Sequence, residues 1–202
     1  MSTTSRVLGE VKRRPPVKPK NLDVRCREHL LPDEVEALIK GARSSRNPER
    51  NSTLILIMYR HGLRVSEAVA LRWAQIDLGM GLMHVNRLKH GVASTHPISA
   101  RESRALHTLK RQSTNSPFVF LSERGAPLSP RTVHDIVRFA GEKAEFDFPC
   151  HPHQLRHACG YYLALKGQDT RAIQAYLGHR SIEHTVRYTA LAPDRFKNFW
   201  QD

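Results

Sequence analysis

Six side chains of this sequence have the types needed for chemistry at a phosphate group. Arginine binds phosphate oxygens bidentately, and fixed cations stabilise the charge that develops in phosphoryl transfer. A tyrosine, with a pKa near 10, becomes a nucleophile when a base lies beside it or when cations favour the phenolate. A histidine and the arginines could supply both. The set consists of Arg64, Lys89, His153, Arg156, His179 and Tyr188.

Two members of the set lie in the segment "YLGHRSIEHTVRYTA", residues 176–190. His179 and Tyr188 would lie on opposite faces of one continuous helix, because each residue turns the helix by about 100°. Gly178 and Ser181 predict a break, since glycine permits a turn and serine is a favoured N-cap. We therefore expect a new helix near Ile182, with His179 just outside it.

Two further members lie in "CHPHQLRHACGYYLAL", residues 150–165. Pro152 suits a first helical position, so His153 and Arg156 share a face near a helix N-terminus, which favours an anion. A histidine-rich helix with ordinary hydrogen bonds is an alternative interpretation. A metal site is another, although the stretch lacks CxxC and HExxH motifs and Arg156 would repel a cation. That site would use Cys150, His151, His153, His157 and Cys159.

Arg64 and Lys89 carry less weight when each is considered alone. Arg64 precedes a predicted helix start, and Glu67 three residues later could simply pair with it. Lys89 lies in "NRLKHGVAS", which is predicted to form a hairpin loop, where a single lysine is usually solvated. Arg87 in the same stretch is a candidate DNA contact. Only the whole set of six predicts a shared cleft.

The elements that must position these residues are mainly helical. Apolar periodicity and capping residues predict helices over about 32–43, 48–60, 66–73, 101–112, 130–142, 152–166, 170–177, 182–190 and 194–200. Short strands are expected at 75–78, 82–86 and 94–99, as an antiparallel hairpin or three-stranded sheet, and 116–122 as a strand or a buried extended segment. The fold class is therefore mainly α with a small antiparallel β-sheet (α+β).

Charge and composition indicate the kind of partner. The 202 residues suffice for one core, and 32 Lys and Arg against 19 Asp and Glu give a net charge of +13. Such a balance favours nucleic acid, although a merely soluble basic protein is the alternative. Residues 1–28 predict a flexible basic arm that follows a DNA backbone, or else a solvated tail. Its cations are Lys12, Arg13, Arg14, Lys18 and Lys20.

Export and membrane insertion are not expected. Three cysteines are too few and too irregular for a disulfide framework, which favours a reducing cytoplasm. The N-terminus has no apolar signal core, and the longest apolar run, "LILIM" at 54–58, is too short to cross a bilayer.

The order of these motifs resembles that of the tyrosine recombinases, the phage integrase family. The matching pieces are "HGLRVSEAVALRW", Lys89, "HPHQLRH" and "YLGHRSIEHTVRYT", and the wording is most similar to that of the small fimbrial-switch inversion recombinases. The resemblance implies that Arg64 and Arg156 hold the scissile phosphate and that Lys89 protonates the departing 5′ oxygen. It further implies His153 as the base, His179 as a phosphate ligand, and Tyr188 as the nucleophile that forms a 3′-phosphotyrosyl link.

The same resemblance implies a biological setting. Residues 29–202 would form the recombinase catalytic domain without the family's usual N-terminal core-binding domain. The enzyme would need no metal, ATP or other cofactor, and would act as a homotetramer on double-stranded DNA with inverted-repeat sites, with accessory DNA-bending proteins. Its expected output is inversion of a promoter-bearing segment in the nucleoid, or movement of a mobile element. A transcriptional regulator with little catalysis and a type IB topoisomerase-like enzyme are the alternatives. The tail residues Phe196, Phe199 and Trp200 would pack on their own core or on a neighbouring subunit.

Overall fold

The computed structural model describes residues 28–87, 91–112 and 116–190. The basic arm up to residue 27, Lys89 and the predicted helix at 194–200 lie outside these ranges. The described helices are α2 (Pro32–Ala42), α3 (Pro48–Arg60), α4 (Val65–Val69), α5 (Ala100–Gln112), α6 (Pro130–Lys143), α7 (Pro152–Leu165), α8 (Thr170–Leu177) and α9 (Glu183–Ala190). A 3-10 turn, η1 (Trp73–Gln75), precedes the strands.

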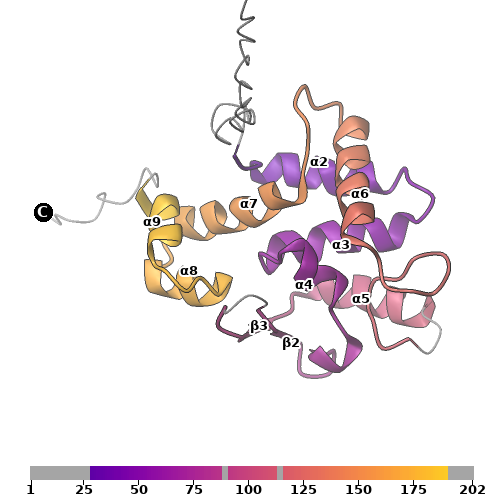
Figure 1. Cartoon of the computed structure of the whole chain (residues 1–202), viewed down its shortest axis with the longest axis horizontal. Coiled ribbons are helices and arrows are strands. Elements are labelled where there is room, and N and C mark those ends of the chain that lie inside the picture. The colour runs from indigo at the N-terminus through magenta and orange to yellow at the C-terminus, as the bar shows by residue number, and fades with distance from the viewer. Residues whose placement is uncertain (1–27, 88–90, 113–115, 191–202) are drawn as a thin grey trace, which may run out of the picture.

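Helix α3 forms the centre of the fold. Every residue from Asn51 to Tyr59 is buried, as expected for a helix that is covered on all sides. Helices α2, α5 and α7 contact it directly, and α6 packs on α2. Figure 1 shows α7, α8 and α9 gathered at one end of the molecule, with α2, α3 and α6 at the other. The core therefore supports the C-terminal helices that carry most of the predicted site.

A three-stranded antiparallel sheet lies beside α8. Its order is β1 (Ile76–Asp77), β2 (Leu82–Val85) and β3 (Ser94–Pro97), with Met83 opposite His96. In β2, Met83 and Val85 are buried and the alternate residues are exposed, which is the period of a half-buried strand. The predicted three-stranded antiparallel sheet is confirmed.

The helix predicted over 66–73 is shorter than expected. It begins at Val65 and ends at Val69. After it, the Leu71 carbonyl accepts from the Val119 N–H at 3.0 Å, and the Trp73 N–H donates to the Pro117 carbonyl at 2.9 Å. These backbone groups pair with the 116–122 segment, so they cannot continue a helix. That segment is extended, with Val119 and Phe120 buried, and joins no sheet.

Among the described residues, no helix combines the length and apolarity that crossing a bilayer requires.

Candidate active site

Four helices and the turns beside them carry five of the six predicted residues. Arg64 caps α4, His153 and Arg156 lie on the first turn and a half of α7, and His179 lies between α8 and α9. Tyr188 lies on α9, which packs against α7 and α8 (Figure 1). Lys89 falls outside the described residues, so its place in the set stays a prediction.

Arg156 is a buried cation that joins two chain segments. Its side chain donates to the Gly62 carbonyl and, at 2.7 Å, to the Leu177 carbonyl. It is 2% exposed, and burial, together with the nearby guanidiniums of Arg64 and Arg87, lowers its pKa to about 10. These bonds place the guanidinium between Gly62, two residues before Arg64, and Leu177, the last residue of α8.

Glu67 holds two of the arginines. One carboxylate oxygen accepts from Arg64 Nη1 at 2.8 Å, and the other accepts from Arg87 Nη1 at 2.9 Å and from the Arg64 backbone N–H. Burial alone would raise the pKa of Glu67, but the Arg64 N–H and the Arg87 charge outweigh it and lower that pKa. The ion pair considered as an alternative for Arg64 therefore exists. It orients an arginine whose side chain stays 32% exposed.

Arg87 has an interior position that does not favour the DNA contact predicted for it. Its side chain is 0% exposed. Besides Glu67, it donates to the carbonyls of His61 and Tyr176. Because its charge is already paired with Glu67 inside the protein, its role here is to support Glu67 and the backbone next to the site.

Two glycines make this packing possible. Gly62 has φ +57°, and a Cβ there would lie 2.4 Å from Leu177 Cδ2. Gly178 has φ +64°, and a Cβ there would lie 2.5 Å from Arg87 Cγ. Both positions need the left-handed backbone and the missing side chain of glycine. They therefore allow the turn before α4 to pack against Leu177 and the turn after α8 to pack against Arg87.

The predicted break between His179 and Tyr188 is confirmed. Helix α8 ends at Leu177, Gly178 adopts the left-handed conformation, and the Glu183 N–H donates to Ser181 Oγ at 3.3 Å. His179 Nδ1 lies 2.9 Å from Thr185 Oγ1. Burial and the charges of Arg156 and Arg64 lower the pKa of His179 to about 3, so this imidazole is neutral and its other nitrogen can face a ligand.

Tyr188 is buried, and its phenol contacts His157, a histidine outside the set of six. The hydroxyl oxygen lies 3.0 Å from His157 Nδ1, and the side chain is 2% exposed. Burial raises the pKa of Tyr188 to about 12, although Arg156 and Arg187 oppose the shift. The Tyr188 ring also stacks toward His179, with 6.3 Å between the ring centroids.

His153, the base implied by the family resemblance, is exposed on the first turn of α7. Its ring meets the His157 ring edge-on at 4.4 Å between centroids. The hydrogen bond of the phenol goes to His157, one helical turn further along. The i, i+4 spacing of His153 and His157 in the sequence places both on one helix face, a pattern that fits a metal site or a histidine-rich helix but does not point to Tyr188. Within the described ranges, no cluster of three or more His, Cys, Asp or Glu side chains could hold a metal ion.

The arrangement of charges predicts an anion site. The guanidiniums of Arg64, Arg87 and Arg156 lie close enough for the first and second to lower the pKa of the third, and Glu67 is the carboxylate shared by Arg64 and Arg87. Three guanidiniums and one carboxylate leave an excess of positive charge. This excess suits the negative charge of a phosphodiester, which arginine side chains bind.

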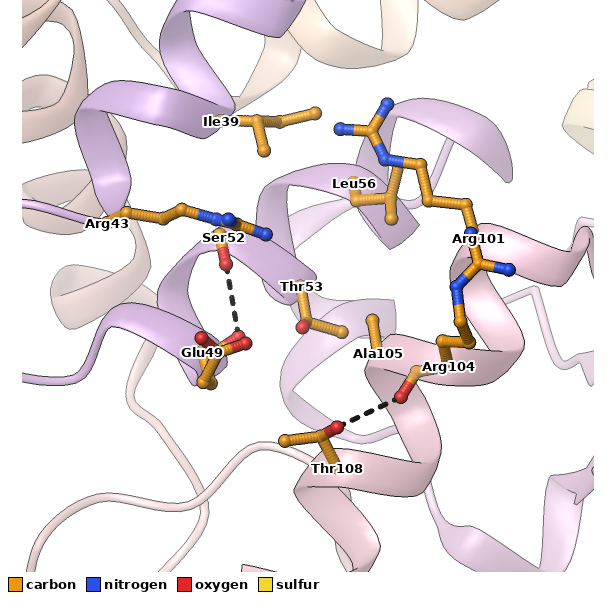
Figure 2. Close-up of a pocket in the computed structure, with 10 residues that line it drawn as sticks. All are labelled: Ile39, Arg43, Glu49, Ser52, Thr53, Leu56, Arg101, Arg104, Ala105 and Thr108. Atoms are coloured by element: carbon orange, nitrogen blue, oxygen red, sulfur yellow. Dashed lines mark hydrogen bonds between the residues drawn. The ribbon is translucent and has the colours of Figure 1, made fainter.

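A separate pocket of about 260 Å³ lies between α2, α3 and α5 and contains none of the six predicted residues. Figure 2 shows Arg43 on one side of the pocket and Arg101 and Arg104 on the other, with both apolar and polar side chains between them, namely Ile39, Leu56, Ser52 and Thr53. Arg101 is paired with Glu36 through bonds of 2.6 and 2.8 Å. This pocket therefore belongs to another part of the surface than the Tyr188 site.

Comparison with known proteins agrees with this geometry. Residues 28–195 match the model of the phage integrase family. The type 1 fimbriae regulatory protein FimE of Escherichia coli K12 is 41% identical over 181 residues, which cover 87% of this chain and 91% of FimE. FimB of the same strain is 42% identical over 183 residues, which cover 88% of this chain and 92% of FimB.

A solved structure shows the same fold. The post-cleavage complex of the XerH site-specific recombinase with a palindromic difH substrate has a TM-score of 0.70 and 21% sequence identity. The match covers 90% of this chain and 54% of the XerH chain.

Proposed function

This chain belongs to the phage integrase family and is a tyrosine-type recombinase, and we propose that it cleaves and rejoins DNA through Tyr188. Arg64 and Arg156 bind the scissile phosphate, His179 donates to it from its free ring nitrogen, and Tyr188 attacks it to form a 3′-phosphotyrosyl bond. Lys89 protonates the departing 5′ oxygen. The covalent bond conserves the energy of the phosphodiester, so resealing needs no ATP.

The strongest support is that Tyr188 on α9 lies close to Arg156 on α7, although the two residues belong to different helices. Arg156 is near enough to lower the pKa of the Tyr188 phenol against the effect of burial, and the His179 ring stacks beside it. Each of these contacts needs a different helix, so their meeting is not a consequence of sequence proximity.

The biological output that we propose is inversion of a promoter-bearing DNA segment. Support comes from the 41% and 42% identity to FimE and FimB, whose names describe regulation of type 1 fimbriae. The substrate would be double-stranded DNA with inverted-repeat sites, bound by a homotetramer with accessory DNA-bending proteins. Such work on chromosomal DNA implies a nucleoid-associated, cytoplasmic protein.

A covalent-trapping experiment tests the nucleophile. A duplex selected from a random pool by binding to the protein is nicked beside the cleavage position, so that the released fragment diffuses away. The native protein should give a slowly migrating, protease-sensitive adduct, and Tyr188→Phe should give none because it lacks the attacking oxygen.

An adduct that persists in Tyr188→Phe would exclude this tyrosine. Tight and specific binding without any adduct from the native protein would instead favour a DNA-binding regulator. Binding should also weaken steeply with salt, because phosphate contacts release counterions. A matched Tyr162→Phe variant should form the adduct like the native chain, since Tyr162 packs against the apolar core.

A further inference from the structure

We propose that His157, through the hydrogen bond between its Nδ1 and the hydroxyl of Tyr188, accepts the proton of Tyr188 during attack on the phosphate. This assignment rests on the proposed function, in which Tyr188 is the nucleophile. It replaces His153, which the family resemblance implies as the base, with the residue that touches the reacting oxygen.

Contacts between α7 and α9 hold the Tyr188 phenol beside the His157 imidazole. Tyr188 lies on α9 and His157 on α7, with 3.0 Å between the phenol oxygen and Nδ1. The tyrosine ring packs on Gly160, where an added Cβ would come within 2.6 Å of Tyr188 Cε2. Tyr161 meets the same ring edge-on at 5.0 Å. The Tyr188 ring therefore packs against α7, and its hydroxyl lies next to the His157 Nδ1 that would accept its proton.

The proposed step balances without a further reagent. The Tyr188 oxygen forms a bond to phosphorus, the bond from phosphorus to the 5′ oxygen breaks, and the phenol proton moves to His157 Nδ1. The 5′ oxygen takes its proton from a separate donor, the role proposed for Lys89. On rejoining, the 5′ hydroxyl attacks phosphorus and returns its proton to that donor, while the bond to the tyrosine breaks and Nδ1 returns its proton to the phenol.

The charges around His157 explain why this transfer waits for DNA. His151, His153 and Arg156 face it from α7, Arg187 and Tyr188 from α9, and Glu28 pairs with Arg187 at 2.6 Å. Burial, followed by the charges of His153, Arg187 and Arg156, lowers the pKa of His157 to about 3. The resting pair is consequently a neutral phenol and a neutral imidazole, and Nδ1 accepts from the phenol when the imidazole carries its proton on Nε2.

A bound phosphodiester changes this balance. Its negative charge offsets the arginines, which favours the protonated imidazole and raises the pKa of His157. The formation of the bond to phosphorus simultaneously acidifies the phenol. Proton transfer is thereby coupled to the presence of a phosphate at Arg156, and the unbound protein keeps its nucleophile protonated.

The central test compares His157→Asn with the native chain on the nicked duplex under single-turnover conditions. The Asn oxygen can accept a hydrogen bond near the position of Nδ1 but does not take up a proton. The rate of adduct formation should fall by about 100-fold or more, the range expected for loss of general base catalysis. DNA affinity and the urea unfolding midpoint should change little. His134→Asn, at an exposed position of α6, is the matched control and should react at the native rate.

A native rate in His157→Asn would overturn the assignment, whereas absence of an adduct from the native protein would overturn the proposed function as well. His153→Asn should lose less activity than His157→Asn, and the reverse order would return the role to His153. If His157→Asn fails to fold, His157→Gln decides, because its amide cannot take up a proton either, and a native rate in that variant would likewise overturn the assignment.

A 5′-bridging phosphorothiolate substrate separates the two ends of the reaction, because a thiolate leaves without being protonated. His157→Asn should stay slow on this substrate, since the defect lies with the nucleophile. Recovery of the native rate would place His157 at the leaving group and contradict the proposal.

Discussion

At the scale of single residues, Glu67 is the side chain on which the arginine cluster depends. It is 1% exposed and lies within 2.9 Å of both the Arg64 and the Arg87 guanidinium. Arg87 has 0% side-chain exposure, so this cation has no access to water. Removing the carboxylate charge would leave a buried guanidinium uncompensated, which is among the most destabilising changes a protein can undergo.

Glu67→Gln is therefore expected to lower the free energy of unfolding by ~3–5 kcal/mol, the range for breaking a buried ion pair from one side. Urea denaturation measures it. The matched control is Glu123→Gln, because Glu123 pairs with Arg46 at the surface, with side-chain exposures of 52% and 82%, and pairs exposed to solvent contribute little to stability. Equal losses in the two variants would contradict the proposed role of Glu67.

At the scale of elements, the contact between α7 and α9 determines where the nucleophile lies. Gly160 leaves room on α7 for the Tyr188 ring, and Tyr188 then reaches His157 one turn earlier on the same helix. A glycine inside a helix costs about 1 kcal/mol relative to alanine. Alanine at position 160 would avoid this cost, but any side chain there would collide with the Tyr188 ring.

Gly160→Ala should consequently destabilise the protein by ~1–3 kcal/mol through overpacking, in spite of the better helix propensity of alanine. It should also reduce adduct formation at least tenfold, because displacing the ring by 1 Å is enough to misplace a reacting atom. Single-turnover cleavage and urea denaturation give the two values.

The control for this change is Gly125→Ala, at a loop glycine with φ +76° and no neighbouring atom within 4 Å of an added Cβ. It should show only the strain of a positive φ, about 1 kcal/mol, with native cleavage. An unchanged cleavage rate in Gly160→Ala would show that the α7–α9 contact does not position the tyrosine.

At the scale of the whole molecule, stability depends on histidines that are buried in the neutral state. Burial lowers the pKa of His96, His157 and His179 to about 3 in each case. His96 belongs to a buried chain in which its Nδ1 lies 3.0 Å from His61 Nδ1, while His61 Nε2 lies 2.8 Å from Glu102 Oε1. This chain joins the sheet to α5 beneath the site.

The folded protein should lose stability as the pH falls from about 6.5 toward 3. In that window the unfolded chain binds protons at these histidines and the native state does not, so the unfolded state is favoured. Between pH 7 and pH 5 the loss should be ~1–2 kcal/mol for each histidine, since one pKa unit corresponds to about 1.4 kcal/mol. Urea denaturation at the two pH values measures it.

Two variants test whether the buried histidines cause the loss of stability between pH 7 and pH 5. His96→Asn should reduce the difference between pH 7 and pH 5, even if it destabilises the protein at both. His134→Asn should leave the difference unchanged, because His134 is exposed. A native protein equally stable at pH 5 and pH 7 would contradict the neutral state of these side chains.

Local rules predicted most of the elements. The break at Gly178 and Ser181, the limits of α3 and α8, and the three short strands follow from capping, turn and periodicity signals that act over a few residues. The end of α4 at Val69 could not be found in this way. Its cause is the pairing of Leu71 and Trp73 with the segment around Val119, and hydrogen bonds between such distant segments leave no local pattern.

The sequence by itself determined the residue types of the site, its cationic character and the family to which the chain belongs, because motif order and charge do not depend on three-dimensional contacts. Only the tertiary structure decided which residues share a contact. It placed Arg87 in the interior beside Glu67 and His157, instead of His153, against the Tyr188 phenol. The physical reason is that burial and the packing of α9 on α7 select one of two histidines a single helical turn apart.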